Sequence, residues 1–445
     1  MPNTGHRLIN VLRTLPVRVL VRCILALAGV AGAVAAAYAI GRFPAEEILT
    51  ARGIALVVIP ATVAVACGEG LFMRSDRQAF LALSIVCGGM IIFAAELWIA
   101  VGQETKAEKI RAIRDAGEMA YPLMLPLEFM RTASGSAKPR LTIDGKPVLP
   151  LSGISRVRTV VCNEGSGWLT YVSDDFGFHN PPGLWQRETM DIVAIGDSFA
   201  LGYCVGSEEN AVARIRRVFP ATLNLGFAGS GPLLELAVLT EYAKRFRART
   251  VLWFFTDTND LLNLSAEVKI PILTRYLEEG FSQKLFGLRD RIDIELKKLA
   301  DTLFAEAEVD GLLDRLFLRA LRLRLGLVYH DAAPSRPPRM DSTFPVFKQV
   351  LRKARDMVGG WGGTIYLVYV PKHLLLMDNE DKENVVGRQA KILDIAGNLG
   401  IPVIDAYDSF PKERAPESFF SENRGHFNAK GYAILADAVL KAIAP

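Results

Sequence analysis

Four residues in the C-terminal half of the chain have types and positions that suit nucleophilic catalysis: Ser198, Gly229, Asn259 and His426. Ser198 follows a short apolar run and a Gly-Asp pair, so it should begin a helix, where backbone N–H groups can stabilise an oxyanion. Gly229 and Asn259 each follow a later apolar run. A backbone N–H and an Asn amide are the donors that a tetrahedral oxyanion needs, and each can be worth about 2.7 to 4 kcal/mol.

Removal of the serine proton requires a general base. His426 stands on an expected loop before the last helix and after the last apolar run. That loop would lie at the carboxyl edge of a parallel sheet, where the other three residues also lie. The imidazole of His426 is therefore the expected acceptor of the Ser198 proton. Each of these residues alone is more typical of a cap or a turn, so the interpretation depends on their order and common edge.

The residues between these four have the pattern of an α/β domain with a parallel sheet. Five short apolar runs, bounded by Gly, Pro, Asn or Asp, are separated by helix-length segments: 192–195, 222–225, 251–255, 365–370 and 402–404. Such runs predict buried parallel strands. We expect a three-layer αβα domain over 186–445 with a helical insertion at 264–344. Within it, 312–327 predicts an amphipathic helix that would lie on a membrane, cover the site or pack on the domain.

The same residues resemble the four signature blocks of the SGNH/GDSL hydrolase superfamily: Gly196-Asp197-Ser198-Phe199, Gly229, Asn259-Asp260 and His426. The resemblance covers 191–431 and implies a flavodoxin-like fold, Ser198 as nucleophile and His426 as base. It also implies an oxyanion hole made of the N–H groups of Ser198 and Gly229 and the Asn259 side chain. No cofactor is implied, and the chain has no C-x-x-C pair or His cluster that would indicate a metal site. Six upstream residues resemble a segment common before this domain in membrane-attached bacterial members: Tyr171, Ser173, Asp174, Gly177, Phe178 and Asn180.

The chain departs from the family pattern at Asn423, where members usually have an aspartate three residues before the catalytic histidine. Four interpretations stay open: the Asn423 amide orients the imidazole, the neighbouring Glu422 replaces the aspartate, the site is a Ser–His dyad, or the chain is inactive. The first three imply a serine esterase or O-acyltransferase acting on an acylated envelope glycan or lipid. A transferase would also need a membrane acyl-donor protein as partner. The fourth implies a glycan-binding or assembly subunit.

Most of the apolar excess of the chain lies in its first hundred residues. The whole chain is 50% hydrophobic with a mean hydropathy of +0.22, and residues 23–40, 53–68 and 80–95 carry no charge. With their flanks, these runs approach the roughly 20 residues of a membrane-spanning helix. Arginines precede the first run, which predicts a cytoplasmic tail at 1–16 and about three membrane helices within 17–102.

This topology predicts an inner-membrane protein of several spans, with the catalytic domain in the periplasm or outside. If the first run is instead a cleaved signal peptide, the large domain is still exported. Residues 103–185 would be a connector and a pre-domain segment. Cys162 and Cys204 are the only cysteines in the exported part, so they are predicted to form a disulfide. The net charge of +4 gives no case for nucleic-acid binding.

Overall fold

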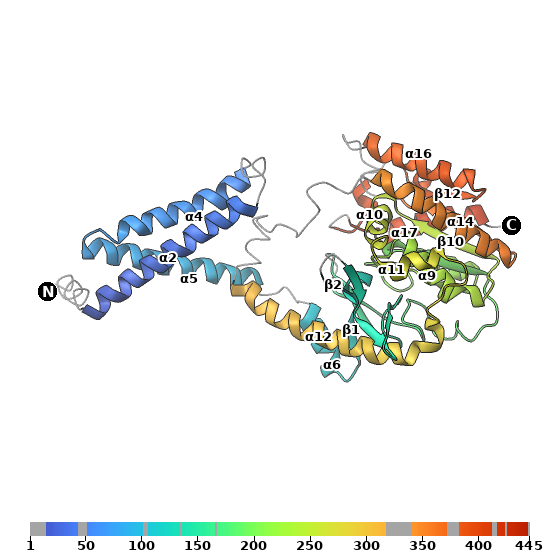
Figure 1. Ribbon diagram of the computed structural model, residues 1–445, viewed down its shortest axis with the longest axis horizontal. Helices are drawn as coiled ribbons and strands as arrows, with labels where there is room; N and C mark the ends of the chain where they lie inside the picture. The colour runs from blue at the N-terminus through green and yellow to red at the C-terminus, as the bar shows by residue number, and fades with distance from the viewer. Residues whose placement is uncertain are drawn as a thin grey trace. The chain divides into compact units, whose positions relative to one another are not determined.

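The computed structural model describes residues 15–42, 51–100, 106–133, 136–164, 167–316, 340–371, 382–411, 416–422 and 425–443. The chain divides into two compact units, Met1–Gln103 with Glu308–Ala332, and Glu104–Ala307 with Ala333–Pro445. Figure 1 shows the described helices and strands of both units, coloured from blue to red along the chain.

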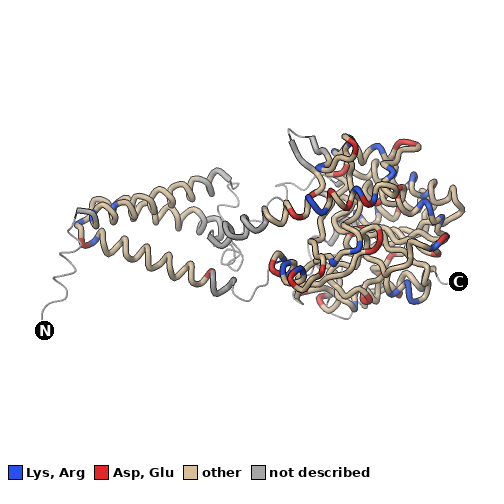
Figure 2. Tube along the Cα trace, turned by 90° about the horizontal axis from the view of Figure 1, so that it is seen from below, with Lys and Arg blue, Asp and Glu red and all other residues tan. Residues whose placement is uncertain are grey.

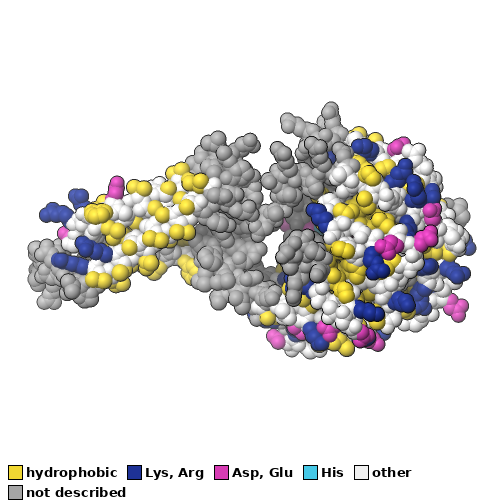
Figure 3. Space-filling model, viewed as in Figure 1, with side chains coloured by type: hydrophobic (Ala, Val, Ile, Leu, Met, Phe, Trp, Pro, Cys, Tyr) yellow, Lys and Arg dark blue, Asp and Glu magenta, His cyan; other side chains and the backbone are white. Residues whose placement is uncertain are grey.

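The N-terminal unit contains three helices among its described residues: α2 (Leu15–Arg42), α4 (Ala51–Gly70) and α5 (Ser75–Ala100). They carry few charges along their length (Figure 2), and apolar side chains cover much of the surface seen in Figure 3. Val17–Ala37 and Ser75–Glu96 are long and apolar enough to cross a membrane, and only 17% and 11% of their most apolar stretches are buried. The apolar part described for α4 is shorter. Helices thus form at all three predicted runs, and two of them reach spanning length within the described residues.

The C-terminal unit is built around a five-stranded sheet in which every neighbouring pair is parallel. The strand order is β12-β11-β10-β8-β9, which is the order 5-4-3-1-2 along the chain and therefore flavodoxin-like. The strands match the predicted runs to within one residue at each end: β8 (Ile192–Gly196), β9 (Thr222–Asn224), β10 (Thr250–Phe255), β11 (Thr364–Tyr369) and β12 (Val403–Asp405). The predicted α/β fold is confirmed.

Helices cover both faces of this sheet, so the domain has three layers. Successive strand residues point to opposite faces. Val193 and Ile195 belong to an apolar core shared with α9, α14 and α16, whereas Ile192 and Ala194 belong to a second core shared with α8 and α17. The described helices of the sheet layers include α7 (Ser198–Leu201), α8 (Ala211–Val218), α9 (Pro232–Glu241), α14 (Phe344–Gly360), α16 (Lys382–Asn398) and α17 (Ala429–Ile443).

A three-stranded sheet forms in the predicted connector and pre-domain region. Its central strand β6 (Arg158–Cys162) pairs parallel with β1 (Ala120–Pro122) and antiparallel with β7 (Leu169–Val172). Helix α6 (Lys106–Asp115) precedes it, as the charged connector predicted. Two hairpins lie between β1 and β6: β2 (Met130–Ala133) with β3 (Ser136–Pro139), and β4 (Leu141–Ile143) with β5 (Lys146–Val148).

Asp174 ties this pre-domain segment together. One of its carboxylate oxygens accepts the backbone N–H groups of Phe176 and Phe178 at 2.8 and 2.9 Å. The other accepts the Asn180 amide at 2.8 Å and the Trp185 indole at 2.7 Å. Burial raises the pKa of Asp174, and these four hydrogen bonds counteract it because they stabilise the carboxylate. The family-like segment therefore folds as a hydrogen-bonded turn against the sheet domain.

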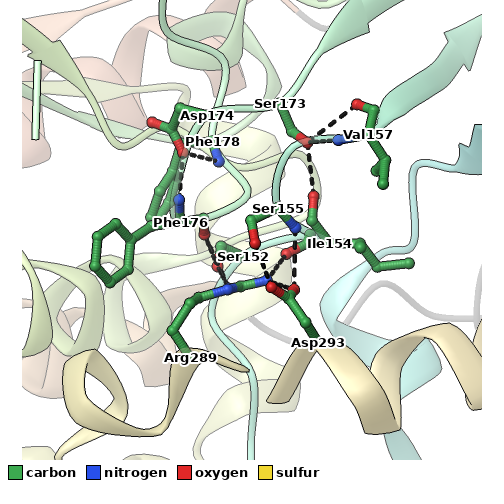
Figure 4. Close-up of polar contacts among 11 residues, drawn as sticks. Ser152, Ile154, Ser155, Val157, Ser173, Asp174, Phe176, Phe178, Arg289 and Asp293 are labelled. Atoms are coloured by element: carbon green, nitrogen blue, oxygen red, sulfur yellow. Dashed lines mark hydrogen bonds and ion pairs between the residues drawn. The ribbon is translucent and has the colours of Figure 1, made fainter. Parts of the chain in front are cut away.

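The helical insertion begins on this same pre-domain segment. The Arg289 guanidinium, at the start of α12 (Arg289–Leu316), donates to the Ser152 hydroxyl and to the Phe176 carbonyl, each at 2.9 Å, and pairs with Asp293 (Figure 4). The Arg289 side chain is 7% exposed, so the ion pair and its hydrogen bonds replace the water that the charge loses. This arrangement agrees with an insertion that packs on its own domain.

Two shorter helices precede α12: α10 (Asp257–Glu267), which runs into the predicted insertion, and α11 (Pro271–Thr274) within it. Along α12, Ile292, Leu296 and Ala300 are fully buried in the main core. The side chains of the predicted amphipathic helix at 312–327 lie outside the described residues. The structure therefore describes how the insertion begins, and the membrane-surface and lid interpretations of 312–327 stay predictions.

Candidate active site

Ser198 is the first residue of α7, directly after β8. Gly196 has φ +144°, and a Cβ there would lie 2.6 Å from the Phe254 carbonyl oxygen, so only glycine fits this turn. Asp197 follows and caps α7, because its carboxylate accepts the Phe199 N–H at 2.9 Å. The backbone of a strand, a glycine turn and a capped helix thus hold Ser198 in one place.

His426 lies between the short 3-10 helix Pro416–Phe419 and α17. Its Nε2 is 2.9 Å from the Ser198 Oγ, as expected for a nucleophile and its base. The imidazole also lies against the Phe199 and Tyr203 rings, with centroid distances of 5.2 and 4.5 Å. These contacts fix the plane of the ring on the nucleophile side. The two residues predicted to react together are therefore in contact.

The other ring nitrogen of His426 contacts a residue that was not expected. Nδ1 is 2.9 Å from the Glu164 Oε1, and the two side chains are only 19% and 10% exposed. A carboxylate can only accept, so the proton belongs on Nδ1, and Nε2 is left to accept the Ser198 proton. In this mostly buried position the negative charge also stabilises the imidazolium that forms. Ser198, His426 and Glu164 have the geometry of a complete catalytic triad.

Among the described residues, Glu164 rather than the predicted Glu422 contacts Nδ1 of His426. Asn423 lies outside the described residues, and the Glu422 side chain is exposed. Glu164 stands in the turn between β6 and β7, 262 positions before His426. A signal for it was present: Glu164 follows Cys162 by two residues, and Cys162 was predicted to bond near the nucleophile helix. Cys162 and Cys204 do form a disulfide.

Asn259 lies beside the nucleophile turn, and the loop that carries Gly229 is joined to this turn by the Phe227 N–H, which donates to the Gly196 carbonyl at 3.0 Å. The Asn259 amide donates to the Asp197 carboxylate at 2.5 Å, which places it beside the residue preceding Ser198. An amide nitrogen has two N–H bonds, so one can hold this contact while the other serves a ligand. Gly229 has φ +77°, and Ser230 N–H turns back to the Phe227 carbonyl at 3.2 Å. Among the described residues, none accepts the N–H of Ser198 or Gly229.

A buried acid supports the loop that carries Gly229. The Glu267 carboxylate accepts the N–H groups of Gly231 and Leu233 at 2.6 and 2.9 Å, at the start of α9. Burial raises the Glu267 pKa to about 7, although these hydrogen bonds favour the charged form. Glu267 therefore holds the loop that carries Gly229 through the N–H groups at the start of α9, and we assign it no contact with the nucleophile.

A small apolar cavity of about 20 Å³ opens beside Gly229 and Glu267. Its other lining side chains include Pro126, Met130, Leu149, Leu234, Ile270 and Leu273. That volume holds about one water-sized group. Ser198, His426 and Asn259 are not among the residues that line this cavity, and Gly229 is the one predicted site residue that does.

His179, the other histidine within the described part of the chain, has a structural environment. Its Nδ1 is 3.1 Å from the Leu201 carbonyl, and its Nε2 is 2.9 Å from the Ser207 hydroxyl. Burial lowers its pKa to about 4, so the ring is neutral at physiological pH. His179 thus packs against the last residue of α7, and both of its ring nitrogens already have partners, so His426 is the candidate general base.

No protein-family model matches the chain, and no curated protein matches it. Solved structures similar to it include a lipolytic G-D-S-L family member from Veillonella parvula, with 16% identity over 57% of this chain and 98% of that one, at a TM-score of 0.33. A lipase/acylhydrolase from Enterococcus faecalis has 15% identity over 57% and 95%, at 0.33. An acetylxylan esterase from Geobacillus stearothermophilus has 14% identity over 58% and 97%, at 0.32. Similarities at such low TM-scores carry no argument about activity, and the flavodoxin-like fold follows from the strand order itself.

Proposed function

We propose that this chain is a membrane-anchored serine esterase or O-acyltransferase that acts on an acylated envelope glycan or lipid through an acyl-serine intermediate. The observation that carries the proposal is the contact of Ser198 with His426 and of His426 with Glu164, each at 2.9 Å. Three side chains from three distant segments meet in the order nucleophile, base and carboxylate. This order is what activation of a serine hydroxyl requires.

In the proposed reaction, the Ser198 Oγ attacks the ester carbonyl carbon while its proton moves to Nε2 of His426. Glu164 stabilises the resulting imidazolium through Nδ1–H. The tetrahedral oxyanion receives hydrogen bonds from the N–H groups of Ser198 and Gly229 and from the Asn259 amide. Nε2–H then protonates the leaving oxygen, and an acyl-serine remains. Water or a glycan hydroxyl, deprotonated by His426, releases the acyl group.

The size of the cavity beside Gly229 favours a short acyl group. It has room for about one methyl-sized group, and its lining is mainly apolar. If the acyl group extends from the Ser198 carbonyl past Gly229 into this space, an acetyl ester fits it. We therefore take an O-acetyl group on an envelope glycan as the preferred substrate within the proposed class.

The alternative function, an inactive glycan-binding or assembly subunit, depended on the missing aspartate at position 423. Glu164 provides a carboxylate at the imidazole from another segment, which supports turnover over binding alone. Whether water or a sugar accepts the acyl group depends on the acyl donor. Transfer requires a donor on the far side of the membrane and hence a partner protein that delivers it.

A fluorophosphonate tests the proposal directly, because it phosphonylates only an activated serine. The full chain in detergent is expected to be labelled at Ser198, with loss of labelling after heat denaturation. Peptide mass spectrometry locates the adduct. A native protein that takes up no probe and hydrolyses no acetyl ester would leave the binding subunit as the remaining function.

We also propose that the helices of the N-terminal unit cross the membrane and that the catalytic unit is exported. Support comes from the three apolar helices, two of which reach spanning length within the described residues, and from the arginines before the first of them. With a cytoplasmic N-terminus, three crossings place the catalytic unit outside. A periplasmically active reporter such as a phosphatase, fused after Pro445, is expected to be active, and a reporter that fluoresces only in the cytoplasm is expected to stay dark. The reverse pattern would contradict the topology.

A further inference from the structure

We infer that the Cys162–Cys204 disulfide is a positioning element of the reaction, because it holds Glu164 against His426. The inference rests on the proposed function, since it concerns the third member of that triad. It assigns to the disulfide a role in turnover that differs from general stabilisation of the fold.

The two half-cystines stand next to two different members of the triad. Cys162 is the last residue of β6, and Glu164 follows it by two positions. Cys204 stands six positions after Ser198, just past Gly202, which ends α7. The bond therefore links the segment of the carboxylate to the segment of the nucleophile, and His426 bridges the same two segments by its hydrogen bonds.

One hydrogen bond described between these two segments is weaker than the covalent bond. The Tyr203 hydroxyl donates to the Val161 carbonyl at 3.4 Å, at the long end of the hydrogen-bond range. The pairing of β6 with β7 becomes irregular between Val160 and Cys162, directly before the turn that bears Glu164. The irregular pairing therefore lies two residues before Glu164 in the chain.

The negative charge of Glu164 favours a more hydrated position of this side chain when the disulfide is absent. The Glu164 side chain is 10% exposed, and a carboxylate loses hydration free energy when it is taken out of water. A short covalent link raises the effective concentration of Glu164 at Nδ1, so the carboxylate is already in place when the imidazolium forms.

The test combines Cys162→Ala/Cys204→Ala with Glu164→Gln in the full chain, with 4-nitrophenyl acetate as substrate. If the disulfide acts through Glu164, the cysteine pair lowers kcat at least about tenfold in the wild type, with little change in KM, and changes kcat less than about twofold in the Glu164→Gln background. A purely structural disulfide would lower kcat by the same factor in both backgrounds, which would overturn the inference. Equal kcat for the wild type and the cysteine pair would overturn it as well.

The controls separate this inference from the proposed function. Cys23→Ala and Cys87→Ala remove free thiols of the helical unit and should leave kcat unchanged. If the oxidised wild type neither hydrolyses the ester nor takes up the fluorophosphonate, both proposals fall; if it does both and the coupling is absent, only this inference falls.

A second measurement tests the inference if the Cys162→Ala/Cys204→Ala variant does not fold. In the wild type, a water-soluble phosphine cleaves the bond to two thiols, while water supplies the oxygen of the phosphine oxide and the two protons. Thiol alkylation and mass spectrometry confirm the cleavage of the Cys162–Cys204 bond. We expect kcat to fall on reduction and to return on reoxidation, and an unchanged kcat in the fully reduced, folded protein would contradict the inference.

Discussion

Ser198→Ala is expected to remove ester turnover and fluorophosphonate labelling together. The substitution deletes one oxygen from a side chain that is 6% exposed, while the turn is set by Gly196 and the Asp197 cap. Loss of a serine nucleophile costs about 10⁶-fold in kcat in a serine protease. The measurement is the rate of 4-nitrophenyl acetate hydrolysis by the full chain, with the melting temperature as a check on folding.

The matched control for this substitution is Ser265→Ala, which removes the hydroxyl of a half-buried serine on α10, away from the triad. It should keep the wild-type rate. If Ser198→Ala retained more than a few per cent of turnover in a folded protein, another group would have to be the nucleophile.

Glu164→Gln is expected to have the second largest effect. The amide keeps the shape of the side chain and can still accept from Nδ1–H, but it brings no negative charge to the imidazolium. The corresponding change in a serine protease lowers kcat by about 10⁴, or about 5.5 kcal/mol of transition-state stabilisation. Glu164→Asp should recover part of this loss, since it keeps the charge and shortens the reach. The measurement is kcat on 4-nitrophenyl acetate for the wild type, Glu164→Gln and Glu164→Asp.

Glu422→Gln and Asn423→Asp are the controls for the third position, because both residues stand close to His426 in sequence. Neither should change kcat by more than about twofold, which is about 0.4 kcal/mol. A large loss in Glu422→Gln with an active Glu164→Gln would assign the role to Glu422. Loss in neither protein would indicate a Ser–His dyad.

Local sequence was enough to predict the sheet and the first two triad members. The strands of a parallel sheet are buried on both faces, so each is a short, nearly continuous apolar run with Gly, Asn or Asp at its end. Ile192–Gly196 and Thr250–Phe255 have this pattern. Ser198 follows the first of these strands by two residues, and His426 precedes the start of α17 by three. The contact of these two side chains follows once all parallel strands end at one edge.

The oxyanion donors were predictable as candidates, but their contacts were not. Asn259 stands after β10, where a polar ligand-binding residue is expected. The bond from its amide to Asp197 depends on how α10 leaves the sheet relative to the nucleophile turn. The pattern of strands in the sequence predicts the position of a residue at the sheet edge. The hydrogen-bond partners of its side chain depend on residues from other segments.

Glu164 shows most clearly what only the tertiary structure decided. A glutamate in a turn between two strands is an ordinary surface residue by its local pattern, and family resemblance pointed to the position three residues before His426. It becomes the partner of Nδ1 because β6 lies beside the nucleophile segment and Cys162 is bonded to Cys204. Sequence alone thus determined the sheet, the serine and the histidine, since each follows from neighbouring residues. The carboxylate was decided by folding, because no local pattern specifies a contact between side chains 262 positions apart.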